Sequence, residues 1–156
     1  MNWGGSEFLV ILLAASLVAA AVGDIRTRTI SNWLNLAIAL AAIPYWYFAG
    51  LELWPDVALR LAVAAGVFAL FAGAFALGMM GGGDVKLLGA VALWLPPGGV
   101  LFLLVAMSIG GGALTLVMWA RHRLKRSEAA LEIPYGVAIA FGGLWLISER
   151  FLNQFG

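Results

Sequence analysis

Long uncharged stretches separated by short polar segments make up most of this chain of 156 residues. The uncharged stretches cover residues 8–23, 31–51, 61–83, 87–120 and 133–148. A helix rises about 1.5 Å per residue, so roughly 20 residues cross a hydrocarbon core about 30 Å thick. Each stretch is therefore a candidate membrane-spanning helix, although residues 87–120 are too many for a single crossing.

The longest stretch contains the sequence Pro96-Pro97-Gly98-Gly99, which is a strong turn signal. We therefore expect two helices that meet in a tight hairpin at this point. The first residues of the chain lack the basic region of a secretory signal peptide, so the first apolar stretch is expected to remain as a helix. The pattern as a whole predicts an all-α, polytopic membrane bundle of six transmembrane helices, forming one domain over residues 1–156.

The composition supports a lipid environment, since 63% of the residues are hydrophobic and only 11% are charged. Soluble domains carry about 25% charged residues. The net charge of +1 gives no indication of a nucleic-acid partner. The absence of cysteine excludes disulfides, thiolate metal sites and cysteine nucleophiles, and we expect no metal ion or other cofactor.

The basic residues predict the orientation, because loops rich in Lys and Arg stay in the cytoplasm. With six spans, the loops after spans one, three and five share one side of the membrane. These loops hold seven of the nine basic residues, namely Arg26, Arg28, Lys86, Arg121, Arg123, Lys125 and Arg126. We therefore expect these loops in the cytoplasm and both termini on the extracytoplasmic side.

Two aspartates are the strongest candidates for chemistry. Asp24 directly follows the first uncharged stretch and Asp84 directly follows the third. Two crossings separate them, so both are expected at the cytoplasmic face. The spans beside them are short, which suggests that the carboxylates lie below the membrane surface. An ionised carboxylate at that depth is costly, and such residues are functional candidates by default.

Glycines precede the second aspartate in the sequence Gly81-Gly82-Gly83-Asp84. Successive glycines next to a membrane helix are tolerable where their backbone lines a cavity or meets another chain. We therefore expect Gly81 and Gly83 to support a site around Asp84. Lys86 is expected to anchor this site at the membrane surface, or to pair with Asp24 or with lipid phosphate.

Two carboxyl groups held close together share one proton, so that one acts as a base and the other as an acid. With a water molecule between them, they have the chemistry of an aspartic peptidase. Other interpretations remain open at this point. Asp24 can pair with Arg28 four residues later, and Asp84 can cap the following helix. A small ion or solute transporter that uses the carboxylates, or an assembly factor without catalysis, also fits these residues.

Three segments resemble the type IV prepilin peptidases, a family of membrane aspartic peptidases with a GxGD motif. Residues 24–32, which read DIRTRTISN, look like the first aspartate motif of the family, and residues 81–87, which read GGGDVKL, look like the second. The sequence IPYG at residues 133–136 resembles the opening of the family's last helix. The resemblance implies that Asp24 and Asp84 are catalytic and that the substrate is a prepilin cleaved at the cytoplasmic face of the bacterial inner membrane.

The chain departs from the family pattern at two positions, where Ser31 and Val137 stand in place of proline. Proline favours the first turn of a helix, so these differences affect how a helix begins rather than the aspartates. The cytoplasmic segment with paired cysteines that longer members carry is missing. The chain thus resembles the short, peptidase-only branch associated with Flp or Tad pili, which makes N-methylation of the mature pilin doubtful.

Overall fold

In the computed structural model of the chain, the backbone is described for residues 4–125 and 135–155, and the side chains for residues 4–120 and 135–150. The described residues form six α-helices and one short π-helical turn. These elements are α1 (Gly5–Thr27), α2 (Asn32–Phe48), η1 (Leu53–Val57), α3 (Ala58–Ala76), α4 (Gly82–Ala92), α5 (Pro97–Lys125) and α6 (Tyr135–Phe155). The expected all-α class is confirmed.

Three helical segments are long and apolar enough to span a membrane, and they cover Gly5–Thr27, Leu53–Ala76 and Pro97–Ala120. In contrast, α2 has 17 residues and α4 only 11. At about 1.5 Å per residue, α4 is roughly 16 Å long, which is about half of the hydrocarbon thickness. The sequence therefore predicted the number of helices correctly, whereas α4 by itself is too short to be a complete span.

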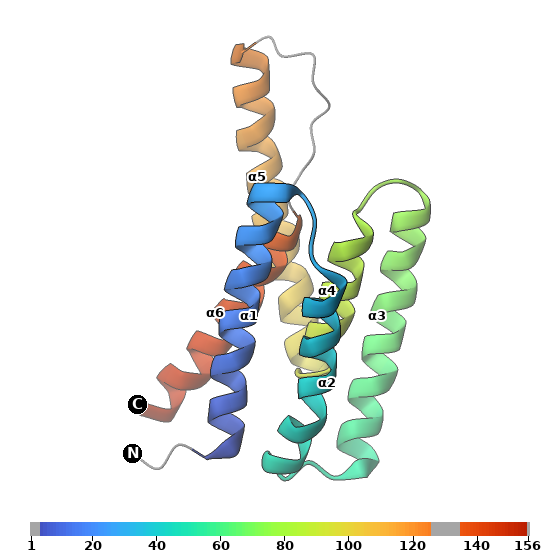
Figure 1. Ribbon diagram of the computed structural model, residues 1–156, viewed down its shortest axis with the longest axis vertical. Helices are drawn as coiled ribbons and strands as arrows, with labels where there is room; N and C mark the ends of the chain where they lie inside the picture. Colours follow the sequence, from blue (N-terminus) through green and yellow to red (C-terminus); the bar gives the residue numbers. More distant parts are fainter. Residues whose placement is uncertain (1–3, 126–134, 156) are drawn as a thin grey trace.

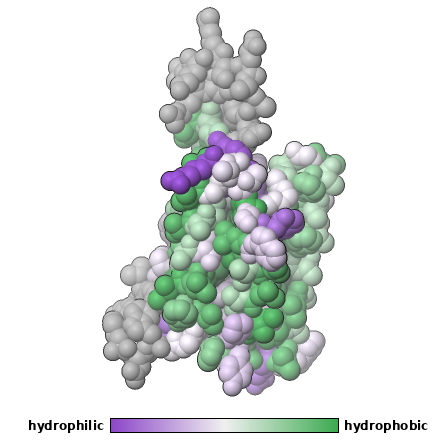
Figure 2. All heavy atoms as spheres, in the orientation of Figure 1, coloured by the Kyte–Doolittle hydropathy of each residue, from purple (hydrophilic) through white to green (hydrophobic). Residues whose placement is uncertain are grey.

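Successive helices run in alternating directions (Figure 1). The start of α1 and the end of α6 lie at one end of the bundle, and the C-terminal ends of α1, α3 and α5 lie at the opposite end. On the face that Figure 2 presents, the side of the bundle is mostly hydrophobic, and hydrophilic residues gather toward the two ends. The side chains of the basic cluster at residues 121–126 lie outside the described residues.

The hairpin expected between α4 and α5 is present, because α4 ends at Ala92 and α5 begins at Pro97. Proline suits the first position of a helix, where its missing N–H group has no helical partner. The polypeptide therefore reverses direction within five residues, and α4 remains short.

Side chains from α2 and α3 fix the C-terminal end of α4. The indole Nε1 of Trp46 donates to the carbonyl oxygen of Leu93 at 2.9 Å, and Nη1 of Arg60 donates to that of Trp94 at 2.6 Å. Arg60 is buried, and its positive charge lies at the negative end of the helix dipole. Carbonyl groups at the end of α4 that have no helical partner are thus satisfied by neighbouring helices.

The packing of α4 places it at the centre of the bundle, against α2, α3 and α6. Leu87 and Leu88 are fully buried there. The last helix, α6, packs against α1 and α5, and glycines permit this close approach. A Cβ atom at Gly143 would come within 2.8 Å of Leu17, and one at Gly142 would come within 3.0 Å of Leu103. Both aspartate-bearing helices, α1 and α4, are therefore held by α6.

Candidate active site

Asp24 lies in the last turn of α1, and its side chain is only 4% exposed. We expected it to follow the first helix, but α1 continues to Thr27 and ends at Arg28, which has a left-handed φ of 54°. Hydropathy marks where the apolar sequence ends, whereas the helical hydrogen bonds continue into the polar residues. The hydroxyl group of Thr27 donates to the carbonyl oxygen of Gly23 at 2.9 Å and extends this last turn.

Asp84 lies in the first turn of α4 and is 8% exposed. We expected it directly after the third span, but α3 ends at Ala76, and residues 77–81 separate the two helices. The N-cap of α4 is Gly81 rather than Asp84, and the amide of Asp84 donates to the Gly81 carbonyl oxygen at 3.1 Å. The Asp84 carboxyl group faces the Gly81 amide from the first turn of α4, so the capping contact considered for this side chain is present, although Gly81 is the N-cap residue.

Asp24 and Asp84 line the same pocket, which has a volume of about 210 Å³. The expectation that the two aspartates share one face of the bundle is thus confirmed. The residues that line this pocket with them are Arg28, Thr29, Ile30, Asn32, Gly81, Gly82 and Gly83. The pocket therefore joins the end of α1, the start of α2 and the start of α4.

Burial raises the pKa of the Asp84 carboxyl group to about 7, and the nearby charge of Asp24 adds to this rise. The backbone amides of Gly81 and Gly136 act in the opposite direction. A carboxyl group with this pKa keeps its proton at pH values where an exposed aspartate is fully ionised. The pocket can therefore hold one carboxyl group in its acid form near neutral pH.

The start of α6 also lies against the two carboxyl groups. The backbone amides of Val137 and Gly136 face the carboxyl group of Asp24, and the Gly136 amide also faces Asp84. Oδ2 of Asp24 is buried without a hydrogen-bond partner, so it has the capacity to accept one. We did not select Gly136 as a site residue from the sequence, although the resemblance at residues 133–136 contained the signal.

The glycines expected to support the site lie beside it. Gly81 and Gly83 both line the pocket, and both belong to the start of α4. A Cβ atom at Gly83 would come within 3.3 Å of the backbone nitrogen of Ile30, so the glycine permits the loop after α1 to lie against α4. The carbonyl oxygen of Gly83 accepts a hydrogen bond from Nδ2 of Asn35 at 3.1 Å. Asn35, which we did not select from the sequence, thus connects α2 to the residue before Asp84.

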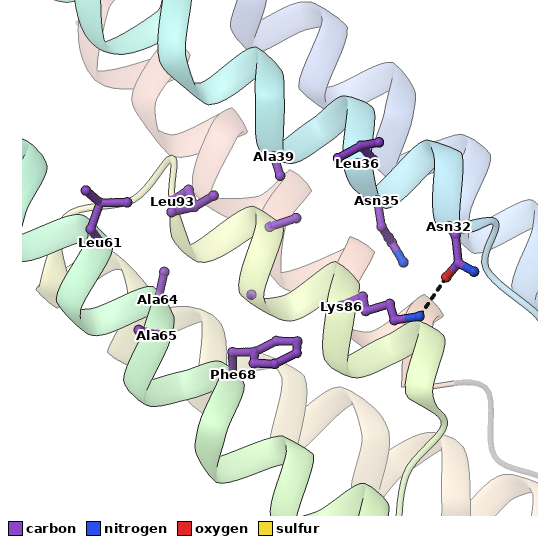
Figure 3. Close-up of a pocket in the computed structure, with 12 residues that line it drawn as sticks. Asn32, Asn35, Leu36, Ala39, Leu61, Ala64, Ala65, Phe68, Lys86 and Leu93 are labelled. Atoms are coloured by element: carbon purple, nitrogen blue, oxygen red, sulfur yellow. Dashed lines mark hydrogen bonds between the residues drawn. The ribbon is translucent and has the colours of Figure 1, made fainter.

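Lys86 is exposed and lies apart from the two carboxyl groups. Its Nζ atom donates to Oδ1 of Asn32 at 2.8 Å, as Figure 3 shows. Lys86 does not line the pocket that holds Asp24 and Asp84. The expected pairing with Asp24 is therefore replaced by a contact with α2, because residues 84 and 86 point to different sides of a helix.

Arg28, which we considered as a partner of Asp24, interacts with it electrostatically, and both residues line the same pocket. Arg28 is the C-cap residue of α1, so its interaction with Asp24 lies at the end of the helix. Among the described side chains, no group of three or more His, Asp or Glu residues gathers where a metal ion would bind. Asp24 and Asp84 are the two carboxyl groups that line this pocket.

Two carboxyl groups in one pocket, one of which holds a proton near neutral pH, can act together as a base and an acid. A sequence model of the type IV leader peptidase family matches residues 11–116, which is more than half of the chain and includes both aspartates. No curated protein and no solved structure gave a significant match.

Proposed function

Because the chain belongs to the type IV leader peptidase family, whose members are aspartic peptidases, we propose that Asp24 and Asp84 are its catalytic pair. The observation that carries the proposal is the burial of both carboxyl groups in one pocket, although 60 positions separate them in the sequence (84 − 24 = 60). The substrate is a type IV prepilin, in which an apolar helix follows a short basic leader, and the reaction removes the leader.

In hydrolysis Asp24 acts as the general base and Asp84 as the general acid. Asp84 holds the shared proton. Asp24 takes a proton from a water molecule while the oxygen atom of that water attacks the carbonyl carbon of the scissile peptide bond. Asp84 donates its proton to the carbonyl oxygen, which becomes a hydroxyl group of the tetrahedral intermediate. When the carbon–nitrogen bond breaks, the amine leaves with the proton taken by Asp24, and Asp84 recovers its own. The raised pKa of Asp84 supports this assignment.

We further propose that the six helices lie in the bacterial inner membrane, with the aspartate end in the cytoplasm and both termini outside. The concentration of basic residues at the C-terminal ends of α1 and α5 and at the start of α4 supports this orientation. In this arrangement α4 dips into the membrane from the cytoplasmic side without crossing it alone. Water and a basic leader then reach the pocket without crossing lipid.

The orientation is open to a direct test because the natural chain has no cysteine. Single cysteines at Thr27, near the aspartate end, and at Tyr47, near the opposite end, report on the two sides of the membrane. An impermeant thiol reagent added outside intact cells is expected to label the variant at position 47 and spare the one at 27. The reverse pattern contradicts the proposed orientation.

The prepilin is proposed to be of the Flp or Tad type. Support comes from the absence of cysteine in these 156 residues, because the zinc-binding segment of longer family members requires paired cysteines. The rival function, a carboxylate-dependent transporter, requires aspartates that become reachable from both sides of the membrane in turn.

A cleavage assay and a proton-uptake assay together test the proposed function against this rival. The purified protein in detergent is incubated with a Tad-type prepilin, and the products are identified by mass. We expect one cut, which separates the basic leader from the mature pilin. An intact prepilin, together with aspartate-dependent proton uptake by vesicles that contain the protein, would favour the transporter.

A further inference from the structure

An apolar groove of about 530 Å³ lies between α2 and α3, with α4 as its floor (Figure 3). Both α2 and α3 pack against α4, yet they make few or no contacts with each other. The residues that line the groove are Asn32, Asn35, Leu36, Ala39, Leu61, Ala64, Ala65, Phe68, Lys86, Gly89, Ala90 and Leu93. Small residues on all three helices keep it open.

The polar residues of the groove gather at one end. Asn32, Asn35 and Lys86 lie together there in Figure 3, and the remaining lining side chains are apolar. Asn32 also lines the pocket that holds Asp24 and Asp84. The polar end of the groove therefore adjoins the candidate active site.

One polar atom at this end has no partner. Asn35 is 4% exposed, and its Oδ1 atom is buried without a hydrogen bond, whereas its Nδ2 atom donates to Gly83. A buried acceptor without a partner is costly unless a ligand supplies a donor. The first N–H groups of a helix have no partner within that helix, so a peptide helix that begins at this end brings such donors. A lipid acyl chain brings none.

The sides of the groove allow entry from the membrane. Leu36, Leu61 and Phe68 are each between 45% and 48% exposed, and they form apolar edges on α2 and α3. A Cβ atom at Gly89 would come within 3.1 Å of Phe68, so a larger residue there would crowd the floor. An apolar helix in such a groove is recognised by side chains at every third or fourth position.

We propose that this groove binds the apolar helix of the substrate, the segment that follows the scissile bond. This inference rests on the proposed function, because it identifies which part of a prepilin the enzyme holds. The start of the helix lies at Asn32 and Asn35, beside the aspartates, and its next turns lie along α4. The groove thereby selects substrates that continue into a membrane helix and places the peptide bond before that helix at the catalytic pair.

The test compares two substrates, a complete prepilin and a short peptide that spans the same cleavage site but lacks the apolar segment. Ala65 is exposed in the groove, so Ala65→Trp fills it without entering the core. We expect this variant to lower the ratio of kcat/KM for the prepilin to kcat/KM for the peptide at least tenfold. Leu70→Trp is the control, because Leu70 is 68% exposed on the same helix and does not line the groove.

If the ratio of the two kcat/KM values is the same in the wild type, Ala65→Trp and Leu70→Trp, the groove proposal is wrong and the proposed function is unaffected. Failure of the wild type to cleave either substrate overturns the proposed function itself. A second measurement does not depend on turnover. In an Asp84→Asn background, Ala65→Cys is expected to form a disulfide with a cysteine in the second turn of the apolar segment of the prepilin, and Leu70→Cys is not. Equal cross-linking at both positions, or at neither, contradicts the proposal.

Discussion

Gly136, at the start of α6, lies directly against the carboxyl group of Asp24 in α1. A Cβ atom at position 136 would come within 2.8 Å of Oδ2 of Asp24 and within 2.7 Å of Ile30. A third helix therefore helps to define the site, beyond the two that carry the aspartates. Only glycine allows the backbone amide at this position to approach both carboxyl groups.

Substitution of this glycine is expected to damage catalysis. In Gly136→Ala, the added methyl group displaces the Asp24 carboxyl group, and small displacements of a catalytic group are costly. We expect kcat/KM for prepilin cleavage to fall roughly tenfold or more, measured with purified protein in detergent.

The matched control is Gly112→Ala in α5, where a Cβ atom would meet nothing within 4 Å. This variant should cleave at the wild-type rate, because it adds the same methyl group to a helix without crowding a neighbour. If Gly136→Ala also cleaves at the wild-type rate, the close contact with Asp24 has no part in catalysis.

Asn35 is predicted to position the start of α4. Asn35→Ala removes the hydrogen bond to the Gly83 carbonyl oxygen, and the net loss of one such bond costs roughly 0.5–1.5 kcal/mol. Both the unfolding temperature in detergent and the cleavage rate should fall. Ser108→Ala serves as the control, since its exposed hydroxyl group bonds only to the carbonyl oxygen of Leu104 in its own helix. Unchanged stability and activity in Asn35→Ala would show that α4 does not depend on this bond.

The raised pKa of Asp84 predicts a loss of activity at alkaline pH. The reaction needs one proton on the pair, and Asp84 loses its proton as the pH rises through about 7. At pH 8 about a tenth of the Asp84 groups remain protonated, so the cleavage rate should fall to about a tenth of its maximum. A rate that stays constant from pH 6 to pH 9 would contradict the assignment of the proton to Asp84.

The raised pKa of Asp84 also makes the free energy of unfolding depend on pH. Between pH 3.8, the ordinary pKa of the group, and about 7, the folded protein binds more protons at Asp84 than the unfolded chain does. The free energy of unfolding should therefore fall as the pH rises through this range. Asp84→Asn removes this contribution. The unfolding temperature of this variant should therefore change less between pH 4 and pH 7 than that of the wild type.

Counting membrane crossings was enough to predict that Asp24 and Asp84 lie at the same face of the bundle. The number of crossings between them is even, whatever the boundaries of each helix are. The boundaries themselves were less accurate. Apolar sequence continues beyond the end of α3, although the helix stops at Ala76. Hydropathy reports the solvent around a residue rather than its backbone conformation, although the short uncharged run before Pro96 did indicate that α4 is short.

The contacts of individual side chains could not be predicted from the sequence. Lys86 pairs with Asn32 because α2 and α4 lie side by side, and no local pattern indicates that neighbour. Gly136 reaches Asp24 from a position more than a hundred residues later, so its role depends on the packing of α6 against α1. Sequence patterns identified the chemical groups, and tertiary packing decided which groups meet.

The central claim is that Asp24 and Asp84 act together, and the most direct test is prepilin cleavage by Asp24→Asn and Asp84→Asn. Asp56→Asn is the matched control, because Asp56 is an aspartate in η1 that does not line the pocket and whose Oδ2 atom accepts a hydrogen bond from the Glu52 amide. We predict that each of the first two substitutions abolishes cleavage in purified, folded protein and that Asp56→Asn cleaves as the wild type does. Cleavage at the wild-type rate by Asp24→Asn or by Asp84→Asn would contradict the account.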